Sequence, residues 1–190
     1  MCGRFQLNLN DSEFQSIFRF SDKSIFRPAE ISGEFVPSLF VPALCLSHKG
    51  EIAPHILKWG LVNPAGKGLL INARAETVSE KPFFRYDFEN RRCLIPAHGF
   101  FEWDDSGKKF LFKKSDDSLF FLGGIFRRLT DSDNCLVLTR PSSAPVSAIH
   151  HREPVLLEKE NARAWLSDGF VARALVETDF SDKLTGRAYD

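Results

Sequence analysis

Short apolar segments recur along this chain, some of them alternating with polar residues, a pattern typical of β-strands. The first lies at residues 4–9, where Phe5, Leu7 and Leu9 share one side. Further strands are predicted at residues 39–47, 51–62, 69–72, 92–95, 99–103, 109–114, 119–127 and 135–139. Polar turns such as residues 104–107 separate several of these strands. We therefore expect a curved, mostly antiparallel sheet.

Helical periodicity is confined to a few short segments. Asp11 is one of three adjacent N-cap candidates that precede an amphipathic pattern. Residues 75–90 are predicted to be helical in parts and broken at Pro82, and residues 158–166 form a further predicted helix. Loops are predicted at residues 24–38 and 63–68. The pattern as a whole predicts one α+β domain.

Two prolines bear on the hairpin predicted from residues 39–47 and 51–62. Pro42 and Pro54 have no backbone N–H to donate to a neighbouring strand. We therefore expect this hairpin to lie towards an edge of the sheet.

The composition is that of a globular protein rather than a disordered or fibrous one. The 190 residues are 43% hydrophobic and 26% charged, and 25 Lys and Arg balance 25 Asp and Glu. A net charge of zero argues against a protein that coats nucleic acid or a membrane by charge alone, but it permits a small basic site. The 19 phenylalanines suit a tightly packed core, because Phe buries no polar atom.

The cysteines and the termini narrow the class further. Cys2, Cys45, Cys93 and Cys135 lie more than forty residues apart without a CxxC pair, which argues against zinc knuckles and thioredoxin-type motifs. No metal or organic cofactor is expected. The N-terminus does not resemble a signal peptide, and no apolar stretch of about 18 residues is present. We expect a soluble, cytoplasmic protein with reduced thiols.

Cys2 is the first candidate for chemistry. If Met1 is removed, Cys2 carries an α-amine with a pKa of about 8 and a thiol with a pKa of about 8.5 on adjacent atoms. An aldehyde captured by the amine as an imine can then be closed by the thiol into a thiazolidine ring. The alternative is that residue 2 is merely a small residue at a frayed chain end.

Two further segments place polar groups in apolar surroundings. Asn72 and Arg74 alternate at the end of an apolar run, so they point to one side and could present an amide beside a phosphate-binding guanidinium. The alternative is an ordinary strand end with a helix cap. Glu102 stands between Phe101 and Trp103. If it is buried, its pKa rises and it can act as a general acid or base; otherwise it points outwards while its neighbours face the core.

His150 and His151 are adjacent, and in a strand they would face opposite ways. Such a pair is a poor bidentate metal site. One of the two could be a proton shuttle while the other is exposed.

Four of these segments occur in a distinctive order. They read Met-Cys-Gly-Arg-Phe, then Asn-Ala-Arg-Ala-Glu-Thr, then Arg-Arg-Cys-Leu-Ile-Pro-Ala-x-Gly-Phe-Phe-Glu-Trp, then Ile-His-x-Arg-x-Pro. Supporting matches are Trp-Gly-Leu-Val at 59–62, Lys-Pro-Phe-Phe-Arg at 81–85 and Gly-Gly-Ile-Phe at 123–126. Together, from Met1 to about Leu166, they resemble the SOS response-associated peptidase (SRAP) family.

This resemblance implies a single compact domain over residues 1–190, with a barrel-like sheet and short peripheral helices. It implies an abasic-site processing protein that removes Met1 autocatalytically and then links covalently to the ring-opened aldehyde of abasic sites in single-stranded DNA. Cys2 would be the nucleophile, and Asn72 would orient its amine and the opened sugar. Glu102 would move protons, and His150 would assist ring opening and release.

The resemblance also implies a DNA-binding surface. Its residues would be Arg4, Arg74, Arg85, Arg152, Trp59 and Trp103. Among them, Arg4, Arg74 and Arg152 would hold flanking phosphates, and the tryptophans would lie near the DNA path. The partner would be single-stranded DNA containing abasic sites. We expect a monomer that needs no metal or membrane, and that is nucleoid-associated when bound to DNA.

The chain departs from the family pattern at several positions. Glu34 stands where the family usually has Asn, and residues 63–66 replace a usual Pro and Trp. His151 and Glu153 replace a usual Asp and Met, and a closing strand motif is missing after Leu166. Because the four implied catalytic residues remain, these departures bear on DNA affinity and strand-junction preference more than on chemistry.

Two other functions stay open at this point. One is a thiol peptidase acting on other proteins, although Cys2 at a chain terminus is better placed to act once than to turn over. The other is a non-enzymatic single-strand binder. With a net charge of zero, the leading hypothesis predicts that a covalent bond retains the DNA more than charge does.

Overall fold

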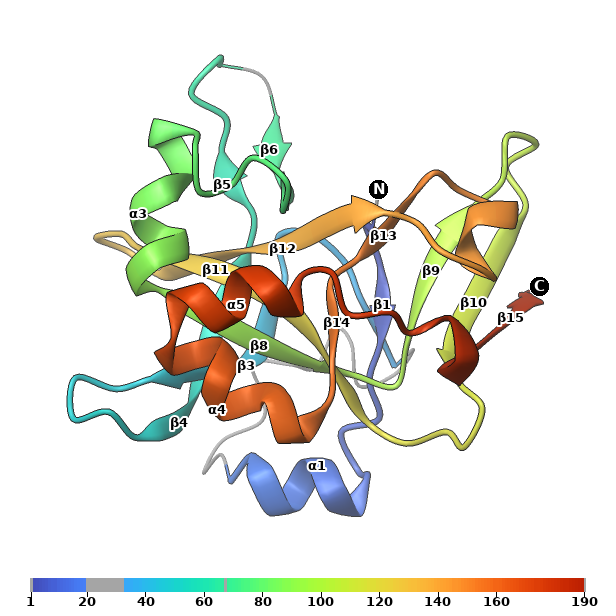
Figure 1. Ribbon diagram of the computed structural model, residues 1–190, viewed down its shortest axis with the longest axis horizontal. Helices are drawn as coiled ribbons and strands as arrows, with labels where there is room; N and C mark the ends of the chain where they lie inside the picture. The colour runs from blue at the N-terminus through green and yellow to red at the C-terminus, as the bar shows by residue number, and fades with distance from the viewer. Residues whose placement is uncertain (1, 20–32, 67, 190) are drawn as a thin grey trace.

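Five strands close into a ring at the centre of the molecule (Figure 1). The computed structural model describes residues 2–19, 33–66 and 68–189. The ring strands are β3 (Phe40–Leu46), β4 (Ile52–Trp59), β8 (Arg92–Ala97), β11 (Phe120–Arg128) and β12 (Asp133–Pro141). They follow the order β12-β4-β3-β8-β11, and β11 pairs with β12 to complete the circuit. The predicted curved, mostly antiparallel, barrel-like sheet is therefore confirmed, with β4 parallel to β12.

Three short strands extend the ring. They are β7 (Asn72–Arg74), β13 (Arg152–Pro154) and β14 (Leu156–Leu157). The first runs parallel to β12, so that Asn72 lies opposite Val137. Because β13 pairs with the end of β12, the chain around residues 150–152 is brought to the same strand.

A second, antiparallel sheet carries the N-terminal segment. Its order is β15 (Leu184–Ala188), β10 (Lys109–Lys114), β9 (Gly99–Trp103), β1 (Phe5–Gln6) and β2 (Glu34–Phe35). Phe5 lies opposite both Phe100 and Phe35, and the N–H of Phe101 donates to the carbonyl of Arg4 at 2.9 Å. These bonds hold the residues before β1 beside β9. A separate hairpin consists of β5 (Leu61–Val62) and β6 (Leu69–Leu70).

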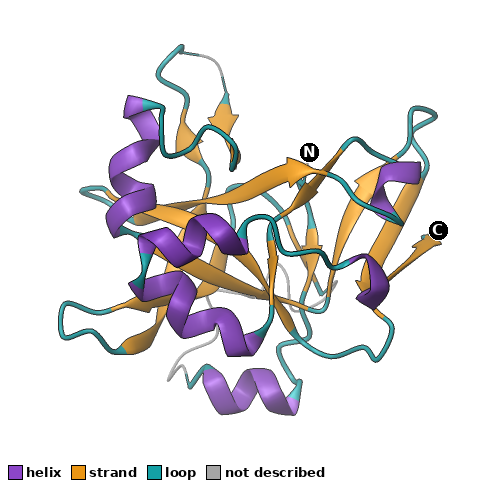
Figure 2. Ribbon diagram, viewed as in Figure 1, coloured by secondary structure: helices purple, strands orange, loops and turns teal. Residues whose placement is uncertain are grey.

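The helices cover one side of the ring. Figure 2 shows α3 (Pro82–Asn90), α4 (Ala162–Ser167) and α5 (Gly169–Leu175) gathered there, with α1 (Ser12–Ile17) apart from them. Short 3₁₀ helices lie at Val146–Ala148, Lys159–Asn161 and Ser181–Lys183. The indole of Trp165 donates to the carbonyl of Cys93 at 3.0 Å, and the Arg92 guanidinium donates to the carbonyls of Trp165 and Leu166. Buried hydrogen bonds thus tie α4 to β8.

Aromatic side chains fill the interior. The largest fully buried side chains are Trp59, Trp165 and Phe at positions 5, 14, 18, 35, 88, 100, 101, 112 and 120. Where the ring closes, the backbone packs too tightly for any side chain at Gly124. A Cβ there would lie 2.8 Å from the carbonyl oxygen of Leu136 and 2.9 Å from the sulfur of Cys93.

The predicted first helix is confirmed, but the second differs from the prediction. Asp11 caps α1 by accepting a hydrogen bond from the N–H of Phe14 at 2.8 Å. Residues 75–80 form turns, and Pro82 begins α3 instead of breaking a helix. Proline is favoured at the first helical position because the N–H that it lacks would have no partner there.

The expected edge position of the 39–47 and 51–62 hairpin is wrong for the strands as wholes, since β3 and β4 each have neighbours on both sides. Neither proline, however, lies at a position where its strand is paired with neighbours on both sides. Pro42 precedes Leu44 and Cys45, where β3 pairs with β8. Pro54 precedes Lys58, where β4 begins to pair with β12. At each proline the strand therefore has one partner only.

The structure contains several helices and strands that the sequence pattern does not predict. The loop expected at 24–38 contains β2, and its residues 24–32 lie outside the described residues. The predicted helix at 158–166 is a 3₁₀ turn followed by α4. Both α5 and β15 were not predicted; β15 pairs with β10, far away along the chain.

Candidate functional site

The residue before β1 meets the start of β7. The side-chain amide of Asn72 donates to the carbonyl of Cys2 at 3.0 Å and to the carbonyl of Val137 at 3.4 Å. Because Asn72 is paired with Val137 in the ring, the sheet register fixes the position of this amide. The other amide atom, Oδ1, is buried and accepts no hydrogen bond from the described residues. The predicted partners Cys2 and Asn72 are thus brought together.

The thiol of Cys2 is completely buried. Burial raises the pKa of this thiol far above its ordinary value, and the negative charge of Glu102 raises it further. The sulfur is therefore protonated at neutral pH, and it needs a base before it can act as a nucleophile.

Glu102 points inwards from β9. Its side chain is only 2% exposed, which settles the choice between the two orientations left open by the sequence. Burial raises the pKa of Glu102 from 4.5 to about 7. A carboxyl group with such a pKa can both donate and accept a proton near neutral pH.

His150 joins the same cluster from the segment before β13. Its Nδ1 lies 3.7 Å from the nearer carboxylate oxygen of Glu102 and within 3.1 Å of both backbone polar atoms of Arg152. The expectation that the two histidines face opposite ways is wrong. They follow a 3₁₀ helix instead of lying in a strand, and the ring of exposed His151 lies 4.5 Å from that of His150.

The three arginines expected on phosphates differ in their surroundings. Arg74 is exposed on β7. Arg4, whose side chain is 36% exposed, makes an ion pair with Glu34 at 2.6 Å. Arg152 is buried, makes a bidentate pair with Glu76 and also donates to the carbonyl of Thr139. Two of the three guanidinium groups are thus already paired with carboxylates.

The remaining residues expected on the DNA path are spread over the fold. Trp103 is half-buried, with the Arg4 guanidinium 5.7 Å from the centre of its ring. Arg85 is exposed on α3. Trp59 requires a correction: it is fully buried and its indole donates to the carbonyl of Ile71 at 2.9 Å, so it cannot stack on a base.

One supporting network was not predicted. Glu153 is fully buried and accepts hydrogen bonds from Arg140 at 2.8 Å and Ser143 at 3.2 Å. Next to it, the Ser142 hydroxyl donates to the carbonyl of His150 at 2.7 Å. The network therefore ties the segment that carries His150 to the end of β12. The signal in the sequence was a pair of opposite charges, Arg140 and Glu153, each close to one end of an apolar run, at residues 135–138 and 154–157.

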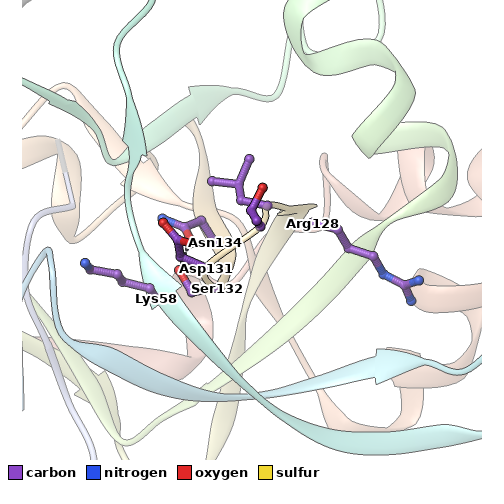
Figure 3. A pocket seen from close by; sticks show the side chains of 7 residues that line it. Lys58, Arg128, Asp131, Ser132 and Asn134 are labelled. Carbon is purple, nitrogen blue, oxygen red and sulfur yellow. Dashed lines mark hydrogen bonds between the residues drawn. The ribbon is translucent and has the colours of Figure 1, made fainter.

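A pocket lies at the turn between β11 and β12. It is lined by Lys58, Arg128, Leu129, Thr130, Asp131, Ser132 and Asn134. Figure 3 shows Lys58 and Arg128 on opposite sides, so the two cations do not converge on one point. None of the four clustered residues lines this pocket.

The chemistry available to the site comes from its side chains. Across residues 2–19, 33–66 and 68–189, no group of three or more His, Cys, Asp or Glu side chains is placed to hold a metal ion. All four cysteines are free. Within the same described part of the chain, no helix is both long and apolar enough to cross a membrane.

Comparison with known proteins identifies the protein family whose model matches this chain. The model of the family "SOS response associated peptidase (SRAP)" matches residues 1–184, further than the motifs that reach about Leu166. Abasic site processing protein YoqW of Bacillus subtilis (strain 168) is 34% identical over 186 residues, which cover 88% of this chain and 80% of that protein. Abasic site processing protein YedK of Escherichia coli (strain K12) is 28% identical over 178 residues, covering 87% and 79%.

Solved structures show the same fold. A crystal structure of a protein from Bacteroides thetaiotaomicron has a TM-score of 0.81 at 20% identity, covering 100% of this chain and 92% of that one. Another, from Bordetella bronchiseptica, has a TM-score of 0.80 at 20% identity and covers all of both chains.

Proposed function

Since this chain belongs to the SOS response associated peptidase (SRAP) family, we propose that it processes abasic sites in DNA through a covalent bond to Cys2. After removal of Met1, the amine and thiol of Cys2 capture the ring-opened aldehyde of an abasic site in single-stranded DNA. The observation that carries the proposal is the buried cluster in which the Asn72 amide contacts Cys2 and the Glu102 carboxyl faces His150.

The proposed reaction proceeds in two bond-forming steps. The Cys2 amine adds to the aldehyde carbon, and loss of one water molecule gives an imine. The thiol then adds to the imine carbon while its proton passes to the nitrogen, which closes a thiazolidine. Because amine and thiol belong to one residue, the second step is effectively intramolecular. Overall, one water molecule is released for each crosslink.

The protonation states fit these steps. Glu102, with a pKa of about 7, can accept a proton from the amine and return it to the departing hydroxyl. The Cys2 thiol is protonated because it is buried, so its addition requires a base, and Glu102 is the carboxylate whose charge acts on it. The unused Oδ1 of Asn72 is an acceptor next to Cys2 that could orient an amine.

The proposal includes a peptidase step. A Cys2 amine exists only after the peptide bond between Met1 and Cys2 has been hydrolysed, with one water molecule consumed and free methionine released. We assign this single hydrolysis to the same cluster. A binder without chemistry is less well supported, because Arg4 and Arg152 are paired with carboxylates and Trp59 is buried.

The experiment is incubation with single-stranded DNA that holds one abasic site, followed by a denaturing gel. We expect a shifted protein–DNA band for the wild type and none for Cys2→Ala. Cys45→Ala is the matched control, since it removes another completely buried cysteine, and it should still give the band. An equal band from Cys2→Ala, or none from the wild type, would overturn the proposal.

A further inference from the structure

Glu34 is held between two cations beside the N-terminal segment. One of its carboxylate oxygens lies 2.6 Å from Nη1 of Arg4, and the other lies 2.8 Å from Nζ of Lys109. Its backbone is fixed in β2, directly opposite Gln6. Burial acts to raise the pKa of Glu34, but hydrogen bonds from Lys109 and Arg4 outweigh it and hold the pKa below 4.5. Glu34 is therefore ionised at neutral pH.

Both cations also lie over aromatic rings. The Arg4 guanidinium is 5.7 Å from the ring centre of Trp103. The Lys109 ammonium is 4.0 Å from the ring centre of Phe101 and 4.6 Å from that of Tyr189. Lys109 and Trp103 are direct partners between β10 and β9, so these side chains belong to one continuous surface. Cations interleaved with aromatic rings are the combination that holds phosphates and bases of single strands.

This surface lies next to the proposed reaction centre. Arg4 is two residues from Cys2, and Trp103 follows Glu102 in β9. A strand whose abasic sugar reaches Cys2 would bring its neighbouring phosphates close to Arg4. Glu34 occupies one donor on Arg4 and one on Lys109, so a phosphate that approaches either cation also approaches the carboxylate of Glu34.

We propose that Lys109 is a second phosphate-binding residue beside Arg4, and that Glu34 is a built-in competing anion which the DNA must displace from both. This inference rests on the proposed function and adds to it a site for the DNA backbone and a residue that limits affinity. The negative charge of Glu34 repels a phosphate at contact distance, so each phosphate contact to these two cations competes with their contact to Glu34. Glu34 thereby weakens reversible binding and leaves retention to the covalent bond.

The chain offers a matched control in Glu158. It also bridges two cations, Lys114 at 3.1 Å and Lys183 at 2.9 Å. Its side chain is 17% exposed, against 12% for Glu34. Lys114 lies five residues beyond Lys109 on β10, which corresponds to roughly 16 Å along the strand. Glu158 is thus a similar ion-pair bridge away from the proposed surface.

The test measures reversible binding of single-stranded DNA carrying a tetrahydrofuran abasic analogue, which has no aldehyde and cannot form the crosslink. Fluorescence anisotropy over a range of salt concentrations gives Kd and its salt dependence. For Glu34→Gln we expect binding about fivefold tighter at low salt, the scale of one exposed ion pair. The slope of log affinity against log salt should be more negative by up to about 1.4, for two added phosphate contacts on a single strand. Glu158→Gln should change neither quantity.

A second pair of variants isolates Lys109. Adding Lys109→Gln to Glu34→Gln should return about half of the gained slope, roughly 0.7. Glu34→Asn, with a shorter uncharged amide, should tighten binding as Glu34→Gln does. Unchanged or weaker binding by both Glu34 variants would overturn the inference, as would a double variant that binds like Glu34→Gln. Failure of the wild type to crosslink true abasic DNA would contradict the proposed function instead.

Discussion

The carboxylate of Glu102 and the Nδ1 atom of His150 lie 3.7 Å apart, although Glu102 lies in one sheet and His150 precedes a strand of the other. Glu102 belongs to β9, which pairs with the N-terminal β1, and His150 precedes β13, which pairs with β12 of the ring. A carboxyl group with a pKa of about 7 and an imidazole are therefore brought together by tertiary structure. Both groups lie near the N-terminal end of the chain, beside Cys2.

Replacing Glu102 by Gln should change how the crosslinking rate depends on pH. In the wild type, the Glu102 carboxyl titrates near pH 7, so the rate should rise as pH increases from 6 to 8 and the carboxylate becomes available as a base. Glu102→Gln should lose this inflection and react about 100-fold more slowly or worse. Single-turnover gels at a series of pH values measure both effects. A variant that keeps the inflection near pH 7 would remove Glu102 from the mechanism.

The same substitution should stabilise the fold at high pH. The pKa of Glu102 is about 7 in the folded chain and 4.5 when unperturbed, so the folded state binds its proton more tightly. The stability this confers is fully present below pH 4.5 and is lost as pH rises through 7. We compare the free energy of unfolding of Glu102→Gln with that of the wild type at each pH. Between pH 4.5 and pH 8 this difference should shift in favour of the variant by on the order of 3 kcal/mol, so that the variant is the more stable protein at pH 8. Urea unfolding at the two pH values tests this, and equal differences at both would contradict it.

The two adjacent histidines should behave differently when replaced. His150 lies 3.7 Å from Glu102, whereas His151 is exposed, contacts the ring of His150 and acts on Glu102 through its charge. His150→Ala should slow crosslinking about 100-fold, while His151→Ala should slow it less than about threefold. Reversible binding of the tetrahydrofuran analogue should change little in either variant. Equal losses of rate in the two variants would show that His150 has no special role.

Glu153 should be required for stability because it neutralises a buried Arg140. Glu153→Met places the residue usual in the family opposite a guanidinium that is buried, and should cost about 3–5 kcal/mol in the free energy of unfolding. The double variant Arg140→Met with Glu153→Met should recover most of this loss, since no unpaired charge remains. Urea unfolding of the single and double variants completes the cycle. A loss below about 1 kcal/mol in the single variant would refute the prediction.

The ring strands were predictable from the sequence because each contains a short apolar run bounded by polar or turn residues. Other strands were not, because their pairing partners lie far along the chain. Glu34 and Phe35 become a strand only because Gln6 and Phe5 lie opposite them. β15 likewise depends on its pairing with β10. The local sequence does not determine such long-range pairing, and residues 34–35 by themselves therefore predict a loop.

The members of the candidate site could be proposed from the sequence, but their geometry could not. The order of four motifs identified Cys2, Asn72, Glu102 and His150 together. The alternation in β9 was compatible with Glu102 on either face, and the structure decided it through the pairing of β9 with both β1 and β10. In the same way, the local sequence pattern does not show that Trp59 is completely buried or that Glu34 makes an ion pair with Lys109.

The central claim is that Cys2 supplies both the amine and the thiol of the crosslink, and intact-mass spectrometry tests it most directly. The purified protein should lack Met1, and after incubation with abasic single-stranded DNA it should show an adduct equal to protein plus DNA minus one water. That adduct should survive denaturation without borohydride, while Cys2→Ala should give none that does. Retention of Met1 with no adduct, or an unreduced stable adduct of Cys2→Ala, would contradict the account.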